Sequence, residues 1–162
     1  MVYTATSICR GEVVLKEQLR GSIWLRTNAA PDTVCLYNAQ VLNVNNNGAP
    51  KPIVFPELHI SVAQIHIFHL VPPTQDPLDY DVKEPNRKLE PVTLLCAAFR
   101  IDGLIRISTQ SNLAKYVELT REVFTSLYDA EISCSLLPAI GTIKTSYAIV
   151  RQSISMFATR TA

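Results

Sequence analysis

The stretch LYDAEISCS, from Leu127 to Ser135, resembles an earlier stretch of the same chain, LYNAQVLNV, from Leu36 to Val44. A second pair of similar stretches precedes them, because LRGSIWLRT (19–27) comes before the first and IDGLIRIST (101–109) before the second. Similar stretches that recur in one order, with gaps between them, are typical of a duplicated unit. The sequence therefore predicts a tandem repeat.

The spacing within the two copies differs in this alignment. Gly21 aligns with Gly103 at an offset of 82 residues, whereas Leu36 aligns with Leu127 at an offset of 91. The second copy is therefore predicted to have nine more residues between the two stretches. In that region Leu113, Tyr116, Val117 and Thr120 have helical spacing, and Ser111 or Asn112 is placed to cap a helix. A short helix is predicted there, whereas Pro31 limits the first copy to a turn.

The rest of each copy is predicted to be β-strand. Residues 92–109, VTLLCAAFRIDGLIRIST, are rich in β-branched and aromatic types on both sides of IDG, which is a turn or bulge signal, so a hairpin is predicted there. Apolar and polar residues alternate in GLIRIS, SIWLRT, QIHIFHL and SISMF, as in strands with one buried face. The fold class is predicted to be mainly β, with two tandem small antiparallel β-barrel or sandwich units packed together.

A proline-rich, charged segment separates the copies. Residues 72–91 contain five of the ten prolines and eight charged residues, without a sustained period, which is typical of a linker. The predicted domains are a first β repeat at 1–71, this linker, and a second β repeat at 92–162. In the first copy, the polar segment NVNNNGAPKP (43–52) is predicted to form a hairpin tip or a flap.

The composition bears on partners. Apolar residues make up 48% of the 162, and charged residues only 18%, against a usual charged share of about 25%. Because few charged groups are available to cover the surface, we expect apolar surface to be buried against another chain, in a homo-oligomer or with a protein partner. The net charge of +1 provides no broad basic field, so nucleic acid is possible but not favoured as a partner.

Location is predicted from what the sequence lacks. The start has no signal-peptide pattern, and the apolar run VTLLCAAF is far shorter than the roughly 20 residues of a membrane helix. The four cysteines, at positions 9, 35, 96 and 134, are widely spaced and form no C-x-x-C pair, as expected of buried thiols in a reducing compartment. We therefore expect a cytoplasmic protein without a membrane partner.

Three short stretches of the second copy, FRIDGLIRIS, NLAKYV and FTSLYDAEIS, resemble a bacterial domain family of unknown function, present here as a tandem duplication. This resemblance implies no particular activity. The arrangement is similar, more loosely, to the Sm-like small β-barrels, which implies RNA binding and ring assembly. The sequence departs from the Sm-like RNA site, because Arg151 has no glycine beside it and Asn112 lacks an aspartate at the expected spacing.

No catalytic or metal site is predicted, and no cofactor. His59, His66 and His69 lie within eleven residues of one another, but spacings of seven and three place strand residues on opposite faces, so histidines on the polar face of a strand are favoured over a metal site. The sequence has no G-x-S-x-G motif and no glycine-rich phosphate loop. These observations favour a protein that is not an enzyme.

Five residues are candidates for binding nucleic acid or another ligand: Arg20, Trp24 and Arg26 in the first copy, and Arg100 and Arg106 in the second. On an alternating strand Trp24 and Arg26 would share a face, where an aromatic ring and a guanidinium can stack a base. The alternative is a tryptophan in the core. Arg106 aligns with Trp24, which does not indicate a core face.

The sequence therefore leads to two hypotheses of different class. The first is a non-catalytic structural or interaction protein that self-associates or docks a partner through β surfaces. The alternative is a small-β-barrel module that binds single-stranded nucleic acid or a nucleotide.

Overall fold

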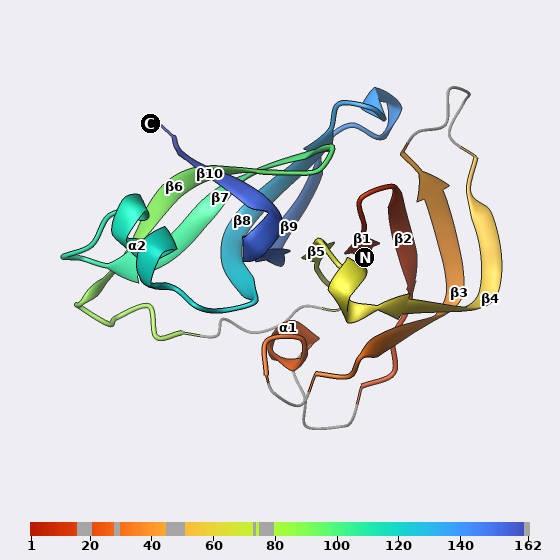
Figure 1. Cartoon of the computed structure of the whole chain (residues 1–162), viewed down its shortest axis with the longest axis horizontal. Helices are drawn as coiled ribbons and strands as arrows, with labels where there is room; N and C mark the ends of the chain where they lie inside the picture. Colours follow the sequence, from red (N-terminus) through yellow and green to blue (C-terminus); the bar gives the residue numbers. More distant parts are fainter. Residues whose placement is uncertain (16–20, 28–29, 45–50, 73, 75–79, 161–162) are drawn as a thin grey trace.

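The computed structural model describes residues 1–15, 21–27, 30–44, 51–72, 74 and 80–160. The predicted mainly β class is confirmed. The strands form one antiparallel ten-stranded sheet in the order β10-β6-β7-β8-β9-β5-β1-β2-β3-β4, which is open, with β10 and β4 at its edges (Figure 1). The two barrels or sandwiches predicted from the sequence are instead one continuous sheet, because β5 of the first half pairs with β9 of the second.

The strands, the α-helices and the last 3-10 helix follow one another in the same order in the two halves. The first half contains β1 (Val2–Tyr3), β2 (Ser7–Glu12), α1 (Gly21–Trp24), β3 (Thr33–Asn43), β4 (Ile53–Ser61), the 3-10 helix η1 (Val62–Gln64) and β5 (Ile67–Phe68). The second contains β6 (Arg87–Cys96), β7 (Phe99–Ser108), α2 (Leu113–Leu119), β8 (Phe124–Cys134), η2 (Pro138–Ile140), β9 (Ile143–Arg151), η3 (Gln152–Ile154) and β10 (Ser155–Thr159). The strand order is β5-β1-β2-β3-β4 in one half and β10-β6-β7-β8-β9 in the other.

Each half has a β-bulge at the same place. The register between β2 and β3 shifts around Gly11, and that between β7 and β8 shifts around Gly103. Opposite these glycines, Asn38 and Asp129 have positive φ angles of 50° and 48°. A Cβ atom on Gly11 would lie 3.0 Å from a carbonyl oxygen of β3, and one on Gly103 would lie 3.2 Å from a carbonyl oxygen of β8. The repeated LYNA and LYDA sequences therefore mark the strand that faces the bulge.

The bulges correct the alignment made from sequence. The counterpart of Gly103 is Gly11, whereas Gly21 is the first residue of α1. Leu36 follows Gly11 by 25 residues and Leu127 follows Gly103 by 24, so the predicted nine-residue difference disappears and α1 occupies the place of α2. The hairpin predicted at IDG is also displaced, because IDG lies inside β7 and the β6–β7 turn is at residues 97–98.

Of the other local predictions, some are confirmed and others are wrong. The predicted helix is α2, and the Asn112 side chain caps it by accepting from the Lys115 backbone N–H at 3.0 Å. Residues 87–91, predicted as linker, belong to β6 and pair with β7. The SIWLRT segment, predicted as a strand, contains α1 and a turn. In the predicted loop at 43–52, residues 45–50 lie outside the described part of the chain.

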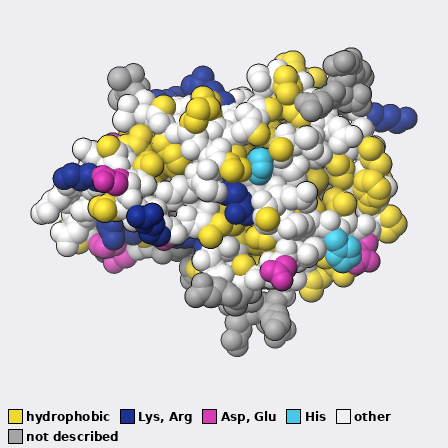
Figure 2. Space-filling view, viewed as in Figure 1, with side chains coloured by type: hydrophobic (Ala, Val, Ile, Leu, Met, Phe, Trp, Pro, Cys, Tyr) yellow, Lys and Arg dark blue, Asp and Glu magenta, His cyan; other side chains and the backbone are white. Residues whose placement is uncertain are grey.

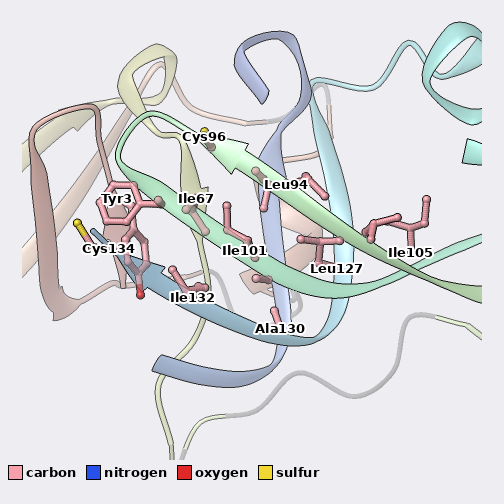
Figure 3. Packing of buried hydrophobic residues seen from close by; sticks show 14 of the residues in the cluster. Tyr3, Ile67, Leu94, Cys96, Ile101, Ile105, Leu127, Ala130, Ile132 and Cys134 are labelled. Carbon is pink, nitrogen blue, oxygen red and sulfur yellow. The ribbon is translucent and has the colours of Figure 1, made fainter. Parts of the chain in front are cut away.

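The halves share their hydrophobic cores (Figure 3). One buried cluster consists mainly of side chains from the second half and includes four from the first half, Tyr3, Ile8, Val44 and Ile67. The other consists mainly of first-half side chains and includes Phe124 and Ile149 from the second half. Within the described residues, no helix has the length and apolar character needed to cross a membrane. A cytoplasmic location stays a prediction.

Candidate functional site

Two of the five predicted binding residues lie together at a pocket of about 360 Å³. Arg26 reaches it from the turn after α1, and Arg106 from β7. The other residues that line it come from the segment before β6, from β6, from α2, from the α2–β8 connection and from β8: Tyr80, Arg87, Tyr116, Thr120, Glu122, Ser126 and Tyr128. The pocket is therefore built by both halves of the chain.

The remaining predicted residues lie elsewhere. Trp24 is half-buried on α1, where it packs against the first-half core, so the predicted shared strand face of Trp24 and Arg26 is wrong. Arg100 forms an ion pair with Asp102 at 3.0 Å, and neither residue lines the pocket. Arg20 is outside the described residues. The strand alternation does not apply because Trp24 ends α1 and Arg26 lies in the turn after it, so the backbone between them is not extended.

Arg26 is held by polar side chains of β8, of β9 and of the segment before β8. Its guanidinium donates to the Ser126 hydroxyl at 2.6 Å, to the Tyr147 hydroxyl at 3.3 Å and to the Glu122 carboxylate at 2.7 Å. Partial burial works against the charge, but the neighbouring Tyr147 and Glu122 outweigh it, so the net effect raises the pKa of Arg26. Arg26 therefore fixes α1 against the second half as a permanent cation.

Arg106 lies in an aromatic and acidic surrounding. Its guanidinium carbon is 4.5 Å from the centre of the Tyr80 ring, and its Nη2 is paired with Glu84. Tyr80 makes an edge-to-face contact with Tyr128, with 4.9 Å between ring centres. Arg87 lies 3.7 Å from the same glutamate. The positive charges of the arginines at this pocket are thus largely balanced by the carboxylates of Glu84 and Glu122. An anionic ligand would have to compete with these carboxylates.

A second cluster of polar side chains, Cys35, Glu57 and His59, lies on β3 and β4. His59 is one of the histidines predicted to lie on the polar face of a strand. The thiol of Cys35 lies 3.4 Å from a carboxylate oxygen of Glu57, and the His59 Nε2 lies 2.8 Å from the same oxygen. The three donor atoms all lie within 4.8 Å of one another. The pKa of Cys35 is raised by partial desolvation and by its hydrogen bond to Glu57, which is the opposite of what a nucleophilic cysteine requires.

Sequence reasoning missed this cluster because it compared the histidines only with one another. Cys35 and His59 are directly opposite each other in the β3–β4 pair, and so are Tyr37 and Glu57. The register of this hairpin is set across a long connection, and alternation within each strand does not determine it. All four cysteines are predicted to be buried; Cys9, Cys96 and Cys134 are, whereas Cys35 is only half-buried, so the prediction is wrong for Cys35.

The open edges of the sheet are a third feature. Side chains of β4 leave an apolar surface at one edge, formed by Ile53, Val54 and Phe55, with exposed fractions of 48%, 65% and 38%. Figure 2 shows hydrophobic side chains gathered over this strand. At the other edge, on β10, Met156 is 68% exposed. Such edges present unpaired backbone groups that another strand can bind.

Comparison with protein-family models, with curated proteins and with solved structures finds no match. The resemblances noted from the sequence therefore stay predictions.

Proposed function

We propose that this protein is a non-catalytic interaction protein that self-associates head to tail, with β10 of one copy pairing with β4 of the next. The observation that carries the proposal is the junction inside the chain, where β5 pairs with β9 at Ile67–Val150 and Phe68–Ile149. In the shared strand order, β5 is the counterpart of β10, and β9 is the counterpart of β4. The two free edge strands, β10 and β4, are thus the counterparts of the two strands, β5 and β9, that already pair between the halves.

The correspondence also predicts a register. The pairings of β6 with β10 and of β1 with β5 place Phe157 where Phe68 lies, and the pairings of β3 with β4 and of β8 with β9 place His59 where Ile149 lies. Phe157 of one copy should therefore lie opposite His59 of the next. An antiparallel contact of this kind would continue the sheet without new secondary structure.

One backbone group is central to the proposed contact. At the internal junction the Arg151 N–H donates to the His66 carbonyl at 2.8 Å. The counterpart of Arg151 is Ser61, since both residues immediately precede a 3-10 helix. The Val62 N–H donates to the backbone carbonyl of Asp32 at 2.9 Å. By antiparallel alternation the N–H of the preceding Ser61 therefore points away from β3, toward the open edge. This N–H would donate to the next copy.

The proposed contact between chains should be weaker than the internal junction. The Arg151 side chain also donates to the Ile65 carbonyl at 2.8 Å, and Ser61 has no comparable side chain. Because one of the anchoring interactions is missing, we expect reversible, concentration-dependent association rather than a permanent oligomer.

The experiment uses the edge N–H of Ser61. The φ angle of Ser61 is −59°, which suits proline, so Ser61→Pro removes the N–H without backbone strain. Ser61→Ala is the matched control, because it keeps the N–H. In size-exclusion chromatography with light scattering over a range of concentrations, wild type and S61A should associate, whereas S61P should remain monomeric.

A mixing experiment tests the head-to-tail arrangement. Met156→Lys places a charge on the exposed β10 edge, a common guard against strand pairing. S61P has a blocked β4 and a free β10, whereas M156K has the reverse, so neither should associate alone but a mixture should give a 1:1 dimer. A wild type that stays monomeric at its highest attainable concentration would refute the proposal, as would equal association of S61P and S61A.

A second candidate function is binding of a nucleotide or of single-stranded nucleic acid at the Arg26–Arg106 pocket. Three arginines, at positions 26, 87 and 106, and two tyrosines, Tyr80 and Tyr128, converge there, and such groups can bind phosphate and stack a base. Fluorescence anisotropy with a labelled oligonucleotide should then give an affinity that falls steeply with salt and is reduced in Arg106→Gln. Arg100→Gln, away from the pocket, is the control, and equal loss in both variants would exclude the pocket as the site.

A further inference from the structure

We infer that the outer face of the β3–β4 hairpin binds a divalent transition-metal ion of the zinc class through Cys35, Glu57 and His59. The inference does not rest on the proposed self-association: the metal would use side chains on the face of the sheet, whereas the association would use backbone groups at the edge of β4.

Strand register brings the three side chains together. Cys35 and Tyr37 alternate along β3 and project from the same face, and the directly opposite residues on β4 are His59 and Glu57. Glu57 and His59 are exposed and Cys35 is half-buried, so the face is open to an ion from solvent. The buried neighbours Val34 and Leu36 fix the opposite face in the core, which prevents the strand from rotating these donors away.

The donor distances suit a small tetrahedral ion. Zinc bonds of about 2.0–2.3 Å imply donor separations of roughly 3.3–3.6 Å in a tetrahedral site. In the structure, the Cys35 sulfur and the Glu57 oxygen are 3.4 Å apart, that oxygen and the His59 nitrogen are 2.8 Å apart, and no pair exceeds 4.8 Å. The three donor atoms therefore already lie near tetrahedral spacing, and rotation of these side chains can complete the site.

In the second half, the equivalent face of the sheet contacts a positively charged side chain, the guanidinium of Arg26. By register, Ser126 and Tyr147 of the second half occupy the positions of Cys35 and Glu57 in the first. Both hydroxyls contact the guanidinium of Arg26, at 2.6 Å and 3.3 Å. In the first half the equivalent face presents a thiol and a carboxylate to solvent. The comparison supports a cation as the ligand of this face.

The donor set selects the type of ion. Thiolate and imidazole favour zinc and its neighbours over magnesium and calcium, which take oxygen ligands. The arrangement does not suit a cysteine nucleophile, because Glu57 lies between the thiol and the imidazole and contacts both. On binding, the Cys35 thiol would lose its proton to solvent and bind as thiolate. Three protein ligands leave a fourth position for water.

Cobalt(II) titration of the purified full-length chain tests the site, with zinc competition as a second measurement. Cobalt should bind at one equivalent with a thiolate-to-cobalt charge-transfer band, and zinc should displace it. Removal of a residue that only hydrogen-bonds to a metal ligand typically lowers metal affinity 10–100-fold. Removal of a ligand itself should lower it more, so Cys35→Ser and His59→Gln should each bind cobalt at least about 100-fold more weakly. Glu57→Gln should also weaken binding.

Two controls make the result decisive. His66→Gln changes a histidine outside the cluster and should leave cobalt binding unchanged. Circular dichroism should show that the variants of these exposed side chains remain folded. Absence of the charge-transfer band in wild type would overturn the inference, and so would unchanged metal affinity in both C35S and H59Q.

Discussion

Ala97 lies in the two-residue turn between β6 and β7 with a φ angle of 53°, in the left-handed region where a Cβ atom crowds the backbone. This conformation costs an alanine about 1–2 kcal/mol, whereas glycine adopts it freely. We therefore expect Ala97→Gly to raise the free energy of unfolding by about 0.5–1 kcal/mol, after allowing for the greater freedom of glycine in the unfolded chain. Urea denaturation measures the difference.

The adjacent Ala98 is the control for this prediction, because its φ angle is not positive. Ala98→Gly gains no relief of strain and should lower stability slightly. If both glycine variants change stability in the same direction, strain at Ala97 does not explain the effect.

His69 should make stability depend on pH. Burial lowers the pKa of this residue from 6.5 to about 4, and although a hydrogen bond to the Leu70 carbonyl opposes the effect, it does not cancel it. With its Nδ1–H donating to Leu70 at 2.8 Å, the neutral ring accepts the Tyr3 hydroxyl at Nε2. Between about pH 6.5 and pH 4 the unfolded chain therefore takes up a proton that the folded chain does not, so stability falls as pH falls through this range.

The size of this effect follows from the shift. The contribution of His69 to stability is complete only well above pH 6.5, and about 2 kcal/mol should be lost between about pH 7.5 and pH 5. Urea unfolding at the two pH values measures the loss in wild type. His69→Gln cannot take up the proton and should lose less; an equal loss in both proteins would show that other groups control the acid sensitivity.

At the scale of elements, the two β-bulges shape the sheet at equivalent places. Gly103 lies so close to β8 that an added Cβ would be 3.2 Å from the Tyr128 carbonyl oxygen, which is backbone and cannot rotate away. Gly103→Ala should therefore force the strands apart and lower the free energy of unfolding by about 1–3 kcal/mol. Thermal unfolding followed by circular dichroism checks this. Ser133→Ala on β8 should change stability little, and similar losses in the two variants would contradict the steric explanation.

The bulges also show which elements could be predicted from sequence. The signals for α2 are local, namely helical spacing and the Asn112 cap, and they were sufficient. The sequence IDG indicates a turn or a bulge, and only the close approach of Gly103 to β8 shows that it is a bulge. Gly11 lacks a flanking sequence similar to that of Gly103, so sequence similarity favours Gly21 as the counterpart. A glycine in a strand does not reveal which backbone approaches it.

At the scale of the whole molecule, the pairing of β5 with β9 joins the halves, and it could not be predicted. It links Ile67 and Phe68 to residues more than eighty positions away in the sequence. Each strand contributes only two residues to this pairing, which is too few for a recognisable sequence pattern. The same limit applies to the Cys35–His59 pair and to the pocket of Arg26 and Arg106, since all three depend on register between separate strands or segments. Alternation within a strand indicates burial but not partners.

The junction also predicts how the molecule unfolds. The Arg151 guanidinium donates to the Ile65 carbonyl at 2.8 Å and lies over the Phe124 ring at 4.6 Å, so one side chain links β9, β8 and the segment before β5. Arg151→Gln should lower the free energy of unfolding by about 1.5–3 kcal/mol, the range for hydrogen bonds to charged groups. Because each core cluster contains residues of both halves, the whole chain should unfold in one step, in the variant as in wild type.

Two probes test this cooperativity. Trp24 is the single tryptophan and packs in the first-half core, so its fluorescence reports that half, whereas far-ultraviolet circular dichroism reports the whole sheet. In urea the two transitions should coincide for wild type, and for R151Q both should move together to lower urea. Tyr37→Phe on the exposed face of β3 is a control that should leave both transitions unchanged. A tryptophan transition that separates from the dichroism transition would mean that the halves are independent folding units, and the shared cores would then not control stability.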